Sequence, residues 1–195
     1  GDEWEETIDR SDKLETIEAH AELTPEEIVS RVKEAGVVGM GGACFPTHVK
    51  LCPPKDFSID TLIINAVECE PYLTADHRLL LEQADQIIIG IKVILKVLGV
   101  DRAVIGIEEN KPDAIALMRS KTSMVSGIEV MPLKMKYPQG GEKQLIEAVT
   151  GRQVPPPPAL PASVGCVVQN VGTVFAIYEA VMKNKPLIDR IVTVD

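Results

Sequence analysis

The sequence predicts an α/β fold: a Rossmann-like, mainly parallel sheet of about four strands, with helices on both faces and a glycine-rich loop before the first strand. Short runs rich in β-branched residues alternate along the chain with longer segments of helical periodicity, as in successive β-α-β units. These runs are continuously apolar, which is typical of strands that are covered on both faces. Glycine and proline stand between the two kinds of segment and mark the turns.

The first elements are recognised by their boundaries. Thr24 precedes proline and two glutamates, which is the pattern of an N-cap, a first-turn proline and acids at the positive end of a helix. Gly36 is expected to end that helix. The next predicted elements are a strand over 61–66, a long helix over 75–98 and a second strand over 102–107.

The second half of the chain continues the alternation. It contains a predicted helix over 112–120, a strand over 128–133, a helix over 142–149, a short strand over 166–169 and a last helix over 173–183. The proline-rich tract 154–161 is expected to be a stiff extended connector, because proline fixes φ and donates no hydrogen bond.

Three segments follow from this organisation. Residues 1–23 are predicted to be an acidic arm or linker, and residues 24–185 one α/β domain. Residues 186–195 are expected to begin a following module, since 191–194 is strand-like and the sequence stops there.

Charge and hydropathy exclude two classes of partner. The 195 residues include 20 Lys and Arg against 29 Asp and Glu, a net charge of −9, which argues against a nucleic-acid partner. The most apolar run, 87–100, is too short to cross a bilayer and carries Lys92 and Lys96. No direct membrane insertion is therefore expected.

No metal site is predicted. The four cysteines lack the CxxC spacing of zinc and iron–sulfur sites and are expected to be reduced thiols. His48 and His77 have no third donor at a metal-ligand spacing. Cys69 is interpreted as a packing residue, because acids on both sides of it disfavour a thiolate.

A glycine-rich loop is the first candidate site. Gly39, Gly41 and Gly42 would let backbone N–H groups approach an anionic or planar ligand, and Lys50 would place a positive charge near it. The loop follows a helix and precedes the first strand, so it is not the usual dinucleotide fingerprint. An ordinary glycine turn with a solvated lysine is the alternative.

Polar residues also follow three of the predicted strands. Asn65, Glu68 and Glu70 come at the end of the first strand; the alternative for the two acids is a solvated loop. After the third strand come Tyr137, Gly140, Gly141 and Glu142, where free amides meet a helix N-terminus; the alternative for Glu142 is an acid that the helix dipole favours. Gln169 ends the fourth strand, and Asn170 and Thr173 follow it, where they would either hydrogen-bond a ligand or only cap the helix. Because the carboxyl ends of parallel strands share one edge, these clusters together predict a bound cofactor.

The motifs GMGGACFPTHVK, NAVECEPY, YPQGGEK, TGRQVP and VQNVGT occur in the same order as in a known family. The chain resembles the C subunit of Rnf electron-transport complexes and, more distantly, the flavin- and NADH-binding subunit of respiratory complex I. The resemblance covers roughly residues 24–189. It implies an FMN cofactor that exchanges a hydride with NAD(H), so that residues 24–185 would be an FMN/NADH-binding domain.

The resemblance also implies roles for individual residues. Gly39, Gly41, Gly42 and Lys50 would hold the phosphate and ribityl side of the flavin, Asn65 and Glu68 would lie along the isoalloxazine, and Tyr137, Gly140 and Glu142 would border flavin and nicotinamide. Gln169, Asn170 and Thr173 would complete the flavin site, while Phe45 and Glu70 match positions that contact NAD(H). Glu70 and Glu142 are the candidate catalytic residues.

Some residues depart from the complex I pattern, and the family implies further components. Met40 replaces an arginine, Val67 an acid and Gln169 an asparagine, all in agreement with the Rnf branch. The [4Fe–4S] clusters that receive the electrons are expected only outside this chain, and the partners are expected to be other Rnf subunits at the cytoplasmic side of the cell membrane.

Three alternatives stay open at this point. The first is the flavin domain of a related cobalamin reductase of propanediol utilisation. The second is a non-catalytic nucleotide-binding module, which would bind no flavin. The third is a scaffold that acts through its acidic arm.

Overall fold

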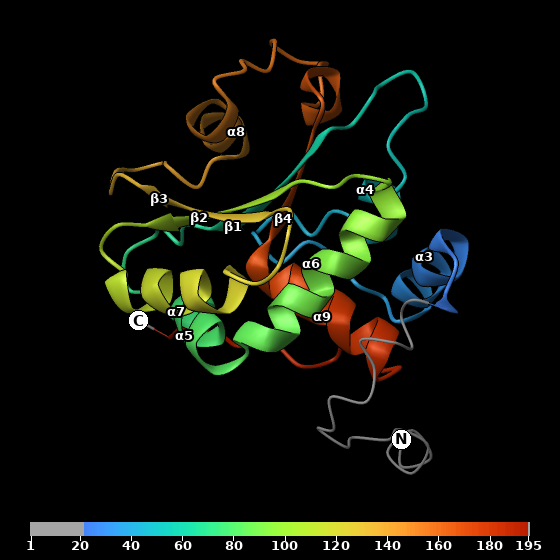
Figure 1. Cartoon of the computed structure of the whole chain (residues 1–195), viewed down its shortest axis with the longest axis horizontal. Coiled ribbons are helices and arrows are strands. Elements are labelled where there is room, and N and C mark those ends of the chain that lie inside the picture. Colours follow the sequence, from blue (N-terminus) through green and yellow to red (C-terminus); the bar gives the residue numbers. More distant parts are fainter. Residues whose placement is uncertain (1–21, 195) are drawn as a thin grey trace.

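A computed structural model describes residues 22–194 of the chain and shows a four-stranded parallel sheet. The strands are β1 (Thr61–Ala66), β2 (Ala103–Glu108), β3 (Ile128–Leu133) and β4 (Cys166–Asn170). Their spatial order is β3-β2-β1-β4, with each neighbouring pair parallel (Figure 1). The predicted α/β class and the predicted number of strands are confirmed.

Helices cover both faces of the sheet, as predicted (Figure 1). One face is covered by α5 (Ala75–Glu82), α6 (Ala84–Leu98), α7 (Pro112–Thr122) and α9 (Val171–Met182), and the other by α8 (Glu142–Thr150). Successive β1 side chains alternate between two cores: Leu62 and Ile64 belong to the larger one, and Ile63 to a smaller one under α8. Both faces of the sheet are therefore buried in hydrophobic cores, which explains why strands such as β1 and β2 are continuously apolar in sequence.

The first helix, α3 (Pro25–Glu34), has the predicted boundaries. The Thr24 hydroxyl accepts from the Glu27 N–H at 3.2 Å, and the Glu27 carboxylate accepts from the Thr24 N–H at 2.7 Å, which is a capping box. Gly36 follows with a φ of +67°, a conformation that favours glycine. α3 packs against α6 and α9 through Ile28 and Val32.

The long helix predicted over 75–98 is wrong in one respect, because it is two helices. Gln83 leaves the helical region with φ −129° and ψ 32°, and separates α5 from α6. The bend lets α5 contact α7 and α9, while α6 packs along α9 and α3. No glycine or proline occupies position 83, so the sequence carries no signal for the break.

Two short elements and one terminal segment also differ from expectation. The helix α4 (Thr47–Lys50) and the 3-10 turn η1 (Pro161–Val164) are too short to show a period. Residues 191–194 form no strand with any described residue, and their aliphatic side chains are 69 to 89 % exposed. Of the predicted acidic arm, residues 1–21 lie outside the described part of the chain.

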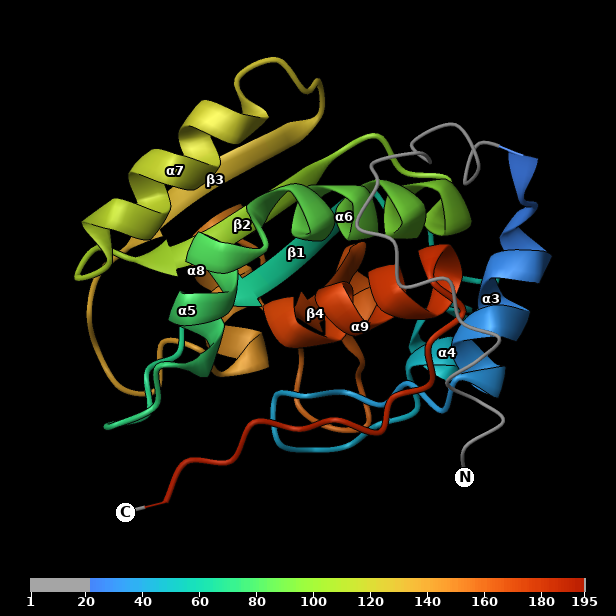
Figure 2. The same cartoon turned by 90° about the horizontal axis from the view of Figure 1, so that it is seen from below.

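Within residues 22–194, no helix combines the length and apolar character that crossing a membrane requires. The segment after α9 instead runs back along the domain, beside the loop that joins α3 to α4 (Figure 2). The Leu187 N–H donates to the Ala35 carbonyl at 2.8 Å, which ties this segment down next to the glycine-rich loop.

Candidate functional site

Two adjoining cavities lie at the carboxyl edge of the sheet, where β1 and β4 end opposite the glycine-rich loop. Their volumes are about 820 and about 620 Å³. The residues common to both walls are Gly41, Asn65, Gly140, Gly141 and Asn170. Asn65, Gly140, Gly141 and Asn170 belong to the motifs that the sequence placed at one edge of the sheet, so the predicted convergence of those motifs is found, and Gly41 adds the glycine-rich loop to the same wall.

The glycine-rich loop is fixed at its base and at its tip. An isolated bridge between Val38 and Pro46 closes it, and the Gly39 N–H donates to the Phe45 carbonyl at 2.8 Å. The Met40 N–H donates to the hydroxyl of Thr173, which is fully buried in the first turn of α9, at 2.9 Å. The loop is therefore anchored to the same helix N-terminus that lines the smaller cavity.

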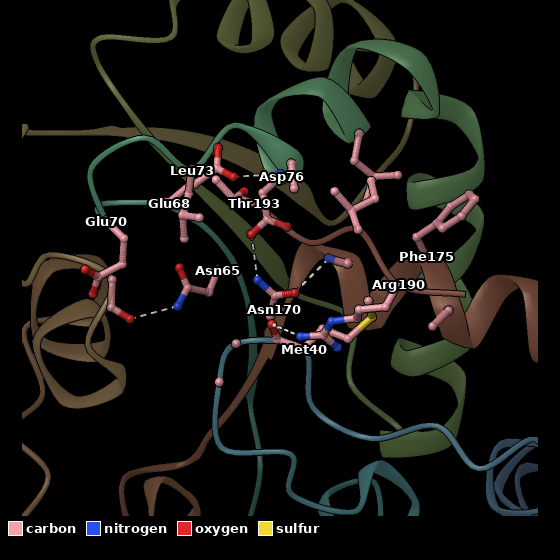
Figure 3. A pocket seen from close by; sticks show the side chains of 18 of the residues that line it. Met40, Asn65, Glu68, Glu70, Leu73, Asp76, Asn170, Phe175, Arg190 and Thr193 are labelled. Carbon is pink, nitrogen blue, oxygen red and sulfur yellow. Dashed lines mark hydrogen bonds between the residues drawn. The ribbon is translucent and has the colours of Figure 1, made fainter. Parts of the chain in front are cut away.

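Two amide side chains organise the shared wall. Asn65 donates through Nδ2 to the Gly140 carbonyl at 2.8 Å and accepts from the Val67 N–H at 3.3 Å, which connects β1 to the turn before α8. The Asn170 Oδ1 accepts from the N–H groups of Gly172 and Thr173 and caps α9. Both asparagines are therefore held in one orientation by the fold (Figure 3).

The smaller cavity contains an amide without a partner. Gln169 is 3 % exposed, and its Nε2 has no hydrogen-bond acceptor. A buried donor left unpaired is costly, so this amide at a cavity wall calls for an acceptor, which a bound water or a ligand would supply. Apolar side chains of Phe45, Val49 and Leu160, each about half exposed, form another part of the same wall.

An ion pair stands in the same cavity. The Lys50 Nζ lies 2.7 Å from the Glu142 Oε1, and the two side chains are 31 and 40 % exposed. Lys50 comes from α4 and Glu142 from the first turn of α8, so residues far apart in sequence meet at the cavity. An anionic ligand group in this cavity would meet the Lys50 ammonium beside the Glu142 carboxylate.

Glu68 has a structural task that the sequence did not reveal. Its backbone has a φ of +46°, and its carboxylate accepts from the N–H groups of Asp76 at 2.8 Å and His77 at 3.1 Å. Glu68 therefore caps the N-terminus of α5 and is not merely a solvated acid, and since it also lines the larger cavity, the flavin contact expected of it stays a prediction. Glu70 lines the larger cavity.

Asp76 is a site residue that sequence reasoning missed. Its Oδ2 accepts from the Asn170 Nδ2 at 2.7 Å, and its side chain lines the larger cavity (Figure 3). Burial raises the pKa of Asp76 to about 6, and the neighbouring Glu68 charge adds to the rise, against the lowering effects of the Asn170 bond and the charge of Arg190. In the sequence Asp76 looks like an ordinary acid in a first helical turn.

The segment after α9 supplies two more residues that the sequence did not single out. Arg190 donates from Nη2 to the Met40 carbonyl at 3.3 Å and lines the larger cavity. Lys185 lines it too and pairs with Glu179 and Asp189, both at 3.0 Å. No local motif points to these contacts, because Arg190 and Met40 are 150 residues apart.

All of the predicted site residues except Tyr137 line one or both cavities. Tyr137 lies outside both cavities and is 69 % exposed. The larger cavity is lined by Gly42, Glu68 and Glu70, the smaller by Gly39, Phe45, Lys50, Glu142, Gln169 and Thr173, and both by Gly41, Asn65, Gly140 and Asn170. Among residues 22–194, no group of three His, Cys, Asp or Glu side chains is arranged to hold a metal ion.

The parallel sheet and its helices define an α/β domain with two adjoining cavities at one edge, and the comparisons identify its family. The chain belongs to the family described as the Nuo51 FMN-binding domain, whose model matches residues 32–179. This agrees with the predicted relation to the complex I subunit.

Two curated relatives sharpen the assignment, and both are C subunits of ferredoxin:NAD(+) oxidoreductase complexes. The chain is 50 % identical over 193 residues to that of the proton-translocating complex of Clostridium ljungdahlii, and 45 % identical over 200 residues to that of the Na(+)-translocating complex of Acetobacterium woodii. Each alignment covers 99 % of this chain but only 40 and 45 % of the relative. The predicted resemblance to the Rnf family is confirmed, and the chain spans less than half the length of these relatives.

A solved structure shares the fold. The NAD+-reducing [NiFe]-hydrogenase in its air-oxidized state superimposes with a TM-score of 0.69 at 29 % identity, over 81 % of this chain and 30 % of that one. Its H2-reduced state gives a TM-score of 0.70 at 28 % identity, over 81 and 31 % of the two chains.

Proposed function

We propose that this chain binds FMN at the carboxyl edge of its sheet and exchanges electrons between NAD(H) and redox centres outside it, as part of an Rnf-type, ion-translocating ferredoxin:NAD oxidoreductase complex. One observation carries the proposal: two cavities share a wall built from the glycine-rich loop and the ends of β1 and β4, and one of them contains the unpaired Gln169 amide. The family model and the names of the relatives support it.

The donor set fits a flavin mononucleotide. The Gly39, Gly41 and Gly42 backbone and the Lys50 ammonium would hold its phosphate and ribityl side, where amides and a cation suit an anion. Gln169 and Asn65 would meet the polar edge of its ring, because both offer amide groups at the cavity wall. When bound, FMN supplies the conversion between two-electron hydride transfer and one-electron transfer.

The protein's own groups would orient the nicotinamide nucleotide. Phe45 and Leu160 provide an apolar surface for a planar ring beside the Lys50 to Glu142 pair. Glu142 and Glu70, the candidate catalytic residues, carry carboxylates at different cavities and would accept hydrogen bonds from ribose hydroxyls. In this arrangement both acids fix the position of the substrate, and Glu142 also holds Lys50 in place.

The remaining redox components belong to other parts of the complex in this proposal. We assign the [4Fe–4S] clusters that take up or deliver the electrons to those parts, and we assign the chain itself to the cytoplasmic side of the cell membrane, among the other Rnf subunits. These assignments follow the resemblance to the longer relatives, of which this chain covers 40 and 45 %.

The test is reduction of the FMN-loaded chain by NADH without oxygen, followed as bleaching at roughly 450 nm, where oxidised flavins absorb. Bleaching at a rate that saturates with NADH is expected. Phe45→Ala should raise the NADH concentration for half-maximal rate while FMN stays bound, whereas Phe57→Ala, at a residue outside both cavities, should leave it unchanged. A bound flavin that NADH does not bleach would overturn the NADH part of the proposal.

A further inference from the structure

A buried lysine, Lys111, binds the loop that lines the larger cavity and has no part in the proposed chemistry. Lys111, between β2 and α7, has a side chain that is only 9 % exposed. Its Nζ donates to the carbonyls of Val67 at 3.1 Å and Glu68 at 3.5 Å. It also lies 3.4 Å from the Glu108 carboxylate and 3.5 Å from the Asn110 side-chain oxygen.

Burying this ion pair costs desolvation free energy, so we look for a role of Lys111 other than stabilising the fold. The Glu108 side chain is 3 % exposed, so two charges are removed from water within one buried pair. The desolvation of a buried ion pair can exceed its Coulombic gain, and well-packed apolar residues of similar volume are often as stable. What apolar residues cannot do is donate hydrogen bonds to the two loop carbonyls.

The carbonyls that Lys111 holds belong to the loop that follows β1. This loop turns sharply at Glu68, which has a φ of +46° and whose carboxylate caps α5 at Asp76 and His77. Glu68 and Glu70 both line the larger cavity from this loop (Figure 3). The position of these two acids therefore depends on the loop backbone whose Val67 and Glu68 carbonyls bind Lys111.

We propose that Lys111 is a positioning residue: with Glu108 as its counter-charge, its ammonium fixes the loop 67–70 and thereby sets where the Glu68 and Glu70 carboxylates stand in the wall of the nucleotide site. The structural half of this proposal stands on the contacts alone. Its consequence for nicotinamide nucleotide binding rests on the proposed function.

The experiment separates positioning from charge neutralisation. Lys111→Met alone leaves the buried Glu108 carboxylate unpaired and is expected to destabilise the fold, so the informative protein is the double variant Glu108→Gln, Lys111→Met, in which no buried charge is left. Lys121→Met is the matched control, because Lys121, within α7, is also in an ion pair, with Asp85 at 2.8 Å, but is 41 % exposed.

Two readouts are measured on each protein. Hydrogen exchange of the peptide containing the Asp76 and His77 amides reports the Glu68 cap and needs no flavin. Steady-state oxidation of NADH by the FMN-loaded chain, with ferricyanide added to take the electrons from the reduced flavin, gives KM and kcat separately. Lys111→Arg, which keeps a cation and its donors, is a further variant should the double variant not fold.

In the double variant, exchange of the α5 cap amides is expected to accelerate by roughly tenfold and KM for NADH to rise by roughly tenfold with kcat little changed, since displaced binding groups cost affinity first. Lys111→Arg should lie closer to wild type than the double variant does, and Lys121→Met should match wild type. If the double variant keeps wild-type exchange and wild-type KM, the pair only neutralises itself and the proposal is wrong. A wild-type chain that bound no FMN would instead refute the proposed function, and the exchange result would still decide whether Lys111 holds the loop.

Discussion

Replacing Thr173 by valine tests how the glycine-rich loop is anchored. Thr173 is fully buried, and its hydroxyl accepts the Met40 N–H at 2.9 Å. Valine keeps the shape of threonine but leaves that N–H without a partner. A buried donor without a partner costs about 1–3 kcal/mol. For a domain of this size, each kcal/mol lowers Tm by about 2–4 °C.

Thr47→Val is the matched control, because Thr47 is also buried, at 1 % exposure, yet its hydroxyl has no partner. Removing an unpaired hydroxyl should leave stability unchanged or raise it by up to about 1 kcal/mol. Thermal unfolding without ligand measures both variants, and FMN titration should show weaker binding for Thr173→Val alone. Equal changes in Tm for the two variants would refute the assignment of the Met40 to Thr173 bond as the loop anchor.

Three further predictions concern single residues. Lys50→Ala should weaken FMN binding by about tenfold or more, because Lys50 points a cation at the smaller cavity, whereas Lys55→Ala, outside both cavities, should not; equal losses would contradict the assigned role. The raised pKa of Asp76, about 6 against an ordinary 3.8, means that the folded state binds the proton more tightly, so this group's contribution to stability falls as pH rises from about 4 to about 7. Urea unfolding should show Asp76→Asn gaining stability relative to wild type by about 2–3 kcal/mol over that window, and a difference that does not change with pH would count against the shift. Gly90→Ala should lower the free energy of unfolding by about 1–3 kcal/mol or more, and Tm with it, because the added Cβ would lie 2.5 Å from the Val174 carbonyl oxygen. An unchanged Tm would show that α6 and α9 are less closely packed.

Elements with a strong period or a clear cap could be predicted from the sequence. The capping residues around Thr24 and the apolar run of β1 lie within a few residues of their structural bounds. The break at Gln83 could not be predicted, because α5 turns there to reach α7 and α9, and such packing leaves no local signal. Residues 191–194 have strand propensity, but the described residues offer them no ladder partner, and the expectation that they begin a following module stays a prediction.

The site could be predicted where one motif carries the chemistry. Asn65 and Asn170 meet because parallel strands bring their ends to one edge, whereas the glycine-rich loop reaches the same edge through its bond to Thr173, which the sequence does not indicate. Asp76 and Arg190 could not be predicted, since they matter only through contacts with residues 94 and 150 positions away. The capping role of Glu68 was hidden for another reason: its partners are only 8 and 9 residues further on, but an ordinary N-cap side chain bonds N–H groups two or three residues away.

The central claim is that FMN binds at the two adjoining cavities, and a titration of the 195-residue chain with FMN tests it most directly. Quenching of flavin fluorescence should saturate at one FMN per chain, and the bound flavin should raise Tm, because a ligand that binds only the folded state stabilises it. Gln169→Leu should weaken this binding, since it removes the amide that lacks an acceptor. Quenching that does not saturate would contradict this claim. So would unchanged FMN affinity in both single variants, Gln169→Leu and Lys50→Ala.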